Sequence, residues 1–194
     1  GVTFRFLAPT NVTAVWPSRG PWTGGSLVTV TGNEFMWSEQ LACVFAVNGT
    51  AAAAATAMVV PVSRFVSAQR VECVSPMLAA ELQTFDAATS FVGKARVHVS
   101  NNGGVDYGSN RTAAAQAAYA NDDGNSNALF WYTATAQVVG VSPARGSEFG
   151  GTLVNVSVAN FSYDAAWSRC RFGGADEGLV VPVARFDAAA RVVQ

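Results

Sequence analysis

Residues 15–35 read VWPSRGPWTGGSLVTVTGNEF, and residues 141–161 read VSPARGSEFGGTLVNVSVANF. Without gaps, the two stretches share a valine, a proline, Arg-Gly, Gly-Gly, Leu-Val, a further valine and the closing phenylalanine. Each shared residue is 126 positions from its counterpart. A fixed offset of this kind indicates an array of repeated structural units rather than one irregular domain.

Alternating apolar and polar residues predict short β-strands in and around the repeated stretch. In the stretch 26–32, Val28 and Val30 point to one side of the strand, while Thr29 and Thr31 point to the other. Further strands are predicted at 11–17, 41–45, 58–65, 70–74, 94–100, 129–132 and 153–158. Short strands separated by turns predict an all-β, immunoglobulin-like β-sandwich.

The offset also organises the chain outside the repeated stretch. Phe4 and Phe6 map onto Phe130 and Tyr132, so residues 1–8 are predicted to be the last strand of a preceding repeat. Residues 9–134 are then one complete domain, and residues 136–194 are the first part of a second, truncated one. We expect Ala51–Ala55 to be a loop insertion and residues 108–127 to be a long, mobile loop.

Composition excludes several classes of protein. The chain has 194 residues, of which half are hydrophobic and 13% are charged, with a net charge of −1 and a single lysine, Lys94. This balance argues against a nucleic-acid partner. No apolar run reaches the roughly 18 to 20 residues that span a bilayer, and any secretory signal is expected to lie outside this sequence.

Acceptor triplets for N-linked glycan give the best indication of compartment. Asn-x-Ser/Thr occurs at Asn11, Asn48, Asn110, Asn155 and Asn160. Most of these asparagines fall on predicted turns or solvent-facing strand positions. The sequence therefore favours an extracellular or cell-surface protein that passes through the secretory pathway.

Catalytic and metal-binding patterns are weak. The single histidine, His98, lies on a predicted strand with no acidic residue near it in sequence, so we expect no catalytic triad. The oxygen-rich segment 121–127 places Ala128 where a calcium-binding EF-hand loop needs glycine, which excludes that loop. A weak calcium site of another kind and a solvated turn both remain open there. We expect no catalytic residue, no resident metal and no cofactor.

The pattern as a whole resembles the IPT/TIG family of immunoglobulin-like domains. The resemblance is carried by Val-x-Pro-x-Arg-Gly, Gly-Gly, Leu-Val-x-Val, Cys-x-Phe, Val-x-Cys-x-x-Pro, Val-x-Val-Ser-Asn-Asn-Gly-Gly and Phe-x-Tyr. The family occurs in plexins, Met-type receptors, fibrocystin-like surface proteins and Rel-type transcription factors. The Cys-x-Phe and Val-x-Cys-x-x-Pro motifs look like those of its disulfide-bonded, extracellular members. The resemblance implies tandem TIG-type repeats, one complete and one partial.

Three cysteines fit this resemblance. Cys43 and Cys73 lie on separate predicted strands of one unit, and we predict a disulfide between them, the alternative being two buried thiols. Cys170 repeats Cys43, and its partner is expected at or just beyond Gln194, so that Cys170 pairs beyond the chain end. The alternative is a reactive thiol at Cys170.

The leading hypothesis is a non-catalytic repeat segment of a larger extracellular glycoprotein, acting in adhesion or recognition or as a structural subunit of an extracellular appendage. Its expected partners are other protein chains or neighbouring repeats, with a glycan as a further candidate. Trp22, in the loop before Gly24-Gly25, could anchor a partner or cover the end of its own sandwich. The alternative functions are a carbohydrate-binding accessory domain of a secreted enzyme and a Rel-type DNA-binding domain.

Overall fold

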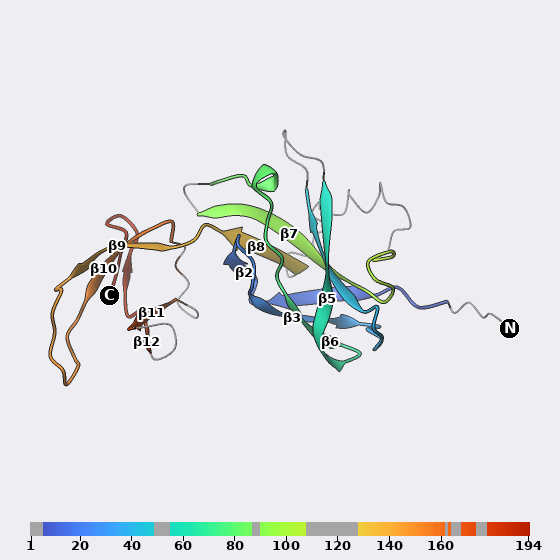
Figure 1. Cartoon of the computed structure of the whole chain (residues 1–194), viewed down its shortest axis with the longest axis horizontal. Helices are drawn as coiled ribbons and strands as arrows, with labels where there is room; N and C mark the ends of the chain where they lie inside the picture. Colours follow the sequence, from blue (N-terminus) through green and yellow to red (C-terminus); the bar gives the residue numbers. More distant parts are fainter. Residues whose placement is uncertain are drawn as a thin grey trace. The chain divides into compact units, whose positions relative to one another are not determined.

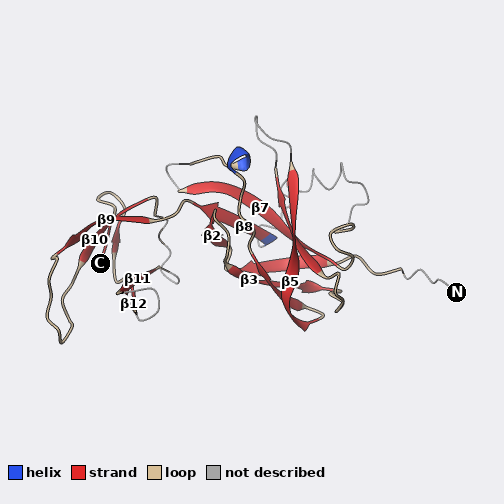
Figure 2. Ribbon diagram, viewed as in Figure 1, coloured by secondary structure: helices blue, strands red, loops and turns tan. Residues whose placement is uncertain are grey.

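The computed structural model describes residues 6–48, 55–86, 90–107, 128–161, 163, 168–173 and 178–194. These residues form strands and loops almost throughout (Figure 2). They divide into two compact units, one made of Gly1–Asp86 with Phe91–Thr133 and the other of Ala87–Ser90 with Ala134–Gln194. The Ala51–Ala55 insertion falls mostly outside the described residues, and the 108–127 loop falls wholly outside them.

Among its described residues, the first unit contains eight strands and a short 3-10 helix (Figure 1). The strands are β1 (Asn11–Trp16), β2 (Arg19–Pro21), β3 (Leu27–Asn33), β4 (Ala42–Val47), β5 (Thr56–Ser67), β6 (Arg70–Val74), β7 (Phe91–Ser100) and β8 (Leu129–Thr133), and the helix is η1 (Ala80–Leu82). Their hydrogen-bonded order is β1-β3-β6-β5-β4-β7-β8-β2. All but the parallel β2–β8 pair are antiparallel.

The long strand β5 turns this order into a sandwich. Its first half, Thr56–Pro61, pairs with β4, whereas its second half, from Val62 to Ser67, pairs with β6. One layer is therefore β1, β3 and β6, and the other is β4, β7, β8 and β2. The all-β, immunoglobulin-like prediction is confirmed.

The core lies between the layers and follows the period of two that the sequence shows. Val28 and Val30 of β3 are fully buried. From the other layer, Phe45 of β4 and Phe130 of β8 are fully buried and meet edge to face, with ring centroids 5.8 Å apart. Such pairs stabilise a core beyond the area that they bury.

One strand is absent from the sequence prediction. Between the predicted strands 11–17 and 26–32, Arg19–Pro21 forms β2 and pairs in parallel with β8. The backbone N–H of Trp131 donates to the Ser18 carbonyl at 2.8 Å, and the backbone N–H of Trp22 donates to the Thr133 carbonyl at 3.0 Å. The sequence could not show this strand, because three residues that include glycine and proline carry no alternation.

In the part of the second unit that the structure describes, six strands form two sheets. They are β9 (Gln137–Ser142), β10 (Asn155–Ala159), β11 (Arg169–Phe172), β12 (Leu179–Pro182), β13 (Phe186–Asp187) and β14 (Val192–Val193). One sheet has the order β13-β14-β10-β9, and the other is the β11–β12 hairpin. A small cluster of Val156, Val158, Val183 and Val193 forms its core.

The sequence repeat is accompanied by a repeat of the strand register. All five Cα pairs between β1 and β3 recur between β9 and β10 when 126 is added to both residue numbers, as Val15 opposite Val30 becomes Val141 opposite Val156. The register shift that skips Thr13 recurs at Val139. Gly24 and Gly25 have φ values of 77° and 85°, and their counterparts Gly150 and Gly151 have 80° and 79°, the left-handed region that favours glycine.

The strand predicted at residues 1–8 is not seen in the described residues. Residues 1–5 lie outside the described part of the chain, and Phe6 to Thr10 form no regular element. The assignment of residues 1–8 to a preceding repeat, and the boundaries 9–134 and 136–194, therefore stay predictions.

Candidate functional site

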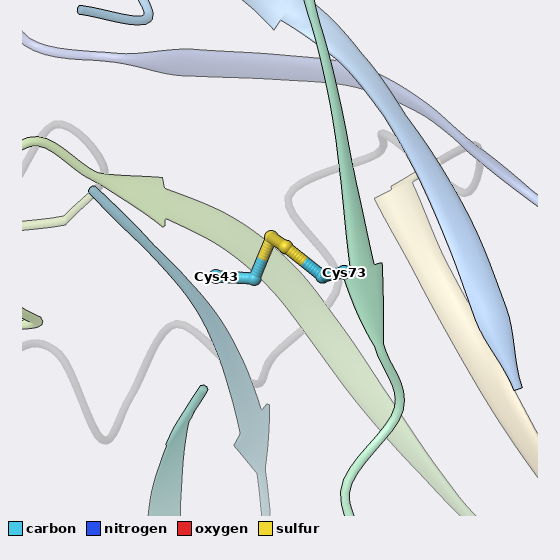
Figure 3. Close-up of a disulfide and its surroundings, with 2 residues drawn as sticks. All are labelled: Cys43 and Cys73. Atoms are coloured by element: carbon cyan, nitrogen blue, oxygen red, sulfur yellow. A yellow bond between two sulfur atoms is a disulfide. The ribbon is translucent and has the colours of Figure 1, made fainter. Parts of the chain in front are cut away.

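The disulfide is the best-defined chemical feature of the first unit. Cys43 on β4 and Cys73 on β6 are joined with an S–S distance of 1.98 Å and a Cα–Cα distance of 6.4 Å. Both residues are fully buried. Figure 3 shows the bridge running from one strand to the other, so the bond links the two layers through the core.

Cys170 occupies the place of Cys43 in the second unit. Cys43 lies opposite Val60 in the β4–β5 pair, and Cys170 lies opposite Val181 in the β11–β12 pair. The Cys170 side chain is half-buried against the valine cluster, and this burial raises the pKa of its thiol. A thiol so placed is less reactive than an exposed one at neutral pH.

The register also indicates where a partner for Cys170 would lie. Val30 is opposite Val71 on β6, and its counterpart Val156 is opposite Val193 on β14. Val193 thus corresponds to Val71, and the position corresponding to Cys73 is two residues further along the strand, immediately after Gln194. Pairing of Cys170 at that position stays a prediction.

The predicted glycan acceptors have different settings. Asn11 on β1 and Asn155 on β10 are exposed. Asn160 is half-buried and has a φ of 54°, next to Phe161, which packs on Phe186. Asn48 is half-buried at the end of β4, with the rest of its triplet outside the described residues, and Asn110 lies wholly outside them. Accessibility therefore favours Asn11 and Asn155.

Trp22 is held at the end of the sandwich rather than displayed from it. Its side chain is half-buried. Its backbone N–H donates to the Thr133 carbonyl, and its backbone carbonyl accepts from the Leu78 N–H at 2.8 Å. This setting suits a residue that covers its own sandwich. A partner-anchoring role for Trp22 stays a prediction.

His98 packs within the fold. Its ring lies 5.4 Å from that of Tyr107, and Val44, its neighbour on β4, is fully buried. A Cβ at Gly104 would lie 2.7 Å from Val59, which shows how closely the turn after β7 covers this face. His98 thus lies on the face of β7 opposite the buried Val97 and Val99, where it is part of the packing under the turn. Across the described ranges, no group of three or more histidine, cysteine, aspartate or glutamate residues could hold a metal ion.

Comparison with protein families gives a match for more than half of the chain. Residues 9–114 match the model of the IPT/TIG domain. The chain belongs to the IPT/TIG family. Strand β8, which completes the TIG sandwich seen here, follows the matched range.

A solved structure has a similar fold. The full extracellular region of plexin A4 superposes with a TM-score of 0.50 and 13% sequence identity over 95% of this chain. The chain spans 12% of the length of that plexin chain. A sequence comparison with curated proteins gives no match. Within the described residues, no helix is long and apolar enough to cross a membrane.

Sequence reasoning missed one surface of the TIG sandwich. Trp131 of β8 is directly opposite Arg19 of β2 on one side and Lys94 of β7 on the other. Its ring stacks on that of Phe91, with centroids 4.9 Å apart and planes at 27°. We call these four residues, Arg19, Phe91, Lys94 and Trp131, the aromatic–basic row. The sequence did hold one indication of this surface, since Trp131 alternates with Phe130 and Tyr132 and so faces the other side of the strand.

Proposed function

We propose that the chain is a non-catalytic, extracellular segment of TIG-type repeats from a larger cell-surface or secreted glycoprotein. It acts in adhesion or recognition, or as a structural subunit of an extracellular appendage. Its partners are other protein chains or neighbouring repeats. The observation that carries the proposal is the buried disulfide between Cys43 and Cys73, because structural disulfides persist in oxidising compartments and are rare in the cytosol.

The repeat supports the view that the chain is part of an array. Val12 and Val15 of β1 are 7% and 6% exposed, whereas their counterparts Val138 and Val141 of β9 are 65% and 48% exposed. In the first unit, the strands of the opposite layer cover these valines. We propose that residues 136–194 are the first part of a second TIG domain, that residues 9–134 are a complete one, and that residues 1–8 are the last strand of a preceding repeat.

Glycan mapping tests the extracellular part of this proposal. When the chain is secreted from eukaryotic cells behind a leader peptide, we expect glycan at Asn11 and Asn155, because both are exposed on strands. Asn11→Gln and Asn155→Gln should each lower the intact mass by one glycan. Occupancy at Asn160 should be lower, because its side chain is half-buried.

Thr13→Ala is the matched control for Asn11→Gln. It keeps the asparagine but removes the threonine hydroxyl that the acceptor triplet requires, together with the γ-methyl group. Both variants should lose the same glycopeptide signal. A secreted chain whose mass is unchanged by glycosidase treatment would contradict the glycoprotein assignment.

A further inference from the structure

The aromatic–basic row lies on the outer face of the β4–β7–β8–β2 layer. Its central residue, Trp131, alternates along β8 with the buried Phe130 and Tyr132, so its side chain lies on the opposite face. The Arg19 guanidinium lies 5.7 Å from the centre of the Phe91 ring, and the Lys94 ammonium lies 5.7 Å from that of Trp131. A stacked pair of rings thus has a cation at each end.

Part of this arrangement is structural, because each cation–π contact also stabilises the sheet. The same contacts also fix two cations beside a partly exposed apolar surface. The Lys94 ammonium carries three N–H donors, which a carboxylate or sulfate can accept. The row therefore combines two aromatic rings, on which a flat apolar surface of a ligand can pack, with N–H donors for an anionic group.

We propose that the aromatic–basic row binds an acidic carbohydrate, a sugar carrying a carboxylate or a sulfate. The C–H face of the sugar ring packs against Trp131 and Phe91, and the anionic group accepts hydrogen bonds from Lys94, while Arg19 adds positive charge at the other end of the row. This ligand class extends the proposed function, on which it rests for its extracellular setting.

An acidic peptide fits the surface less well. Extended peptides commonly bind by adding a strand to a sheet edge. The edge beside the row is β2, which has three residues and ends at Pro21, a residue with no N–H to donate. Recognition at this site must therefore use side chains on the face of the sheet.

Single-stranded nucleic acid also stacks on aromatic side chains, but it is held along a positively charged groove. The net charge of −1 argues against such a groove. Asp86 forms a backbone bridge with Phe91 and is exposed, so a carboxylate borders the Arg19 end. We therefore assign the larger share of anion binding to Lys94.

Titration of the purified chain with defined oligosaccharides, followed by tryptophan fluorescence and calorimetry, tests the proposal. The probes are a polyuronate oligosaccharide, a sulfated glycosaminoglycan oligosaccharide, a neutral oligosaccharide of the same length and a single-stranded oligonucleotide. We expect one or both acidic sugars to bind, with an affinity that falls as salt rises. Lys94→Gln and Trp131→Leu should each weaken binding about tenfold, the loss of one charge-assisted hydrogen bond or one apolar platform.

Three further variants keep the test decisive. Lys94→Arg should retain binding, and Asp86→Asn should strengthen it, since it removes a like charge from the border of the site. Arg64→Gln is the matched control, because Arg64 is a 66% exposed cation that pairs with Glu72 on the other layer. Thermal melting shows whether each variant is folded. If Trp131→Leu does not fold, the binding measured for Lys94→Gln decides between the outcomes.

The proposal is overturned if no acidic sugar binds, if the neutral oligosaccharide or the oligonucleotide binds as tightly, or if Arg64→Gln weakens binding as much as Lys94→Gln. Any of these results, obtained with glycans and the disulfide in place, would refute the binding site and leave the extracellular assignment standing. Absence of both glycan and disulfide would refute that assignment instead.

Discussion

The double substitution Cys43→Ala/Cys73→Ala is expected to lower the free energy of unfolding of the first unit by about 3 to 4 kcal/mol. The disulfide closes a loop across 30 residues, and without it the unfolded chain regains the entropy that this closure removes. Since domains of this size are stable by only about 5 to 15 kcal/mol, the loss is a large fraction of the total. Urea unfolding followed by tryptophan fluorescence measures it.

Cys170→Ala is the control for this prediction. It removes the free, half-buried thiol of the second unit and should leave the unfolding of the first unit unchanged. Reduction and alkylation of the unsubstituted chain should reproduce the loss seen in the double variant. A double variant within about 1 kcal/mol of the parent would mean that the bond does not hold the two layers together.

Phe45→Ala is the second change with a large expected effect. Phe45 is fully buried and meets Phe130 edge to face, so its removal leaves a cavity between the layers. Loss of such a ring costs about 3 to 5 kcal/mol, through lost transfer energy and the unfilled cavity. The same urea unfolding measures it.

Phe85→Ala provides the comparison, because Phe85 is 58% exposed and its removal should change stability by no more than about 0.5 kcal/mol. Equal effects of the two substitutions would place the Phe45 ring outside the core. A loss for Phe45→Ala near that of the double cysteine variant would show that apolar packing and covalent closure contribute comparably to this sandwich.

The fold could be read from the sequence because its strands alternate. Val28 and Val30 alternate with Thr29 and Thr31, and this period of two is what a strand with one buried face requires. The repeat offset strengthened the prediction, since the same alternation recurs in Leu153–Val158. The structure adds that the strand register itself repeats, with the skipped residue at the same place in both copies.

The surface features could not be read in the same way. The row around Trp131 depends on β2, β7 and β8 lying side by side, and β2 and β8 are more than 100 residues apart in the chain. The packing of His98 under Tyr107 depends on the path of the turn after β7, which alternation along a strand does not encode. Side chains that meet across a sheet are set by register, and register follows from the whole fold.

The family assignment and the proposed function rest on different observations. The match to the IPT/TIG domain over residues 9–114 and the likeness to a plexin extracellular region establish the fold. Fold alone does not determine function. The proposed function depends on the disulfide, the exposed acceptor asparagines and the repeat, which together support it.

Intact mass of the secreted chain, measured before and after glycosidase treatment and with and without reduction, tests that assignment most directly. We predict a mass that falls on glycosidase treatment, and a single cysteine, Cys170, that is alkylated in denaturant before reduction. Cys43 and Cys73 should react only after reduction. A secreted chain with no sugar and three cysteines open to alkylation would contradict the account.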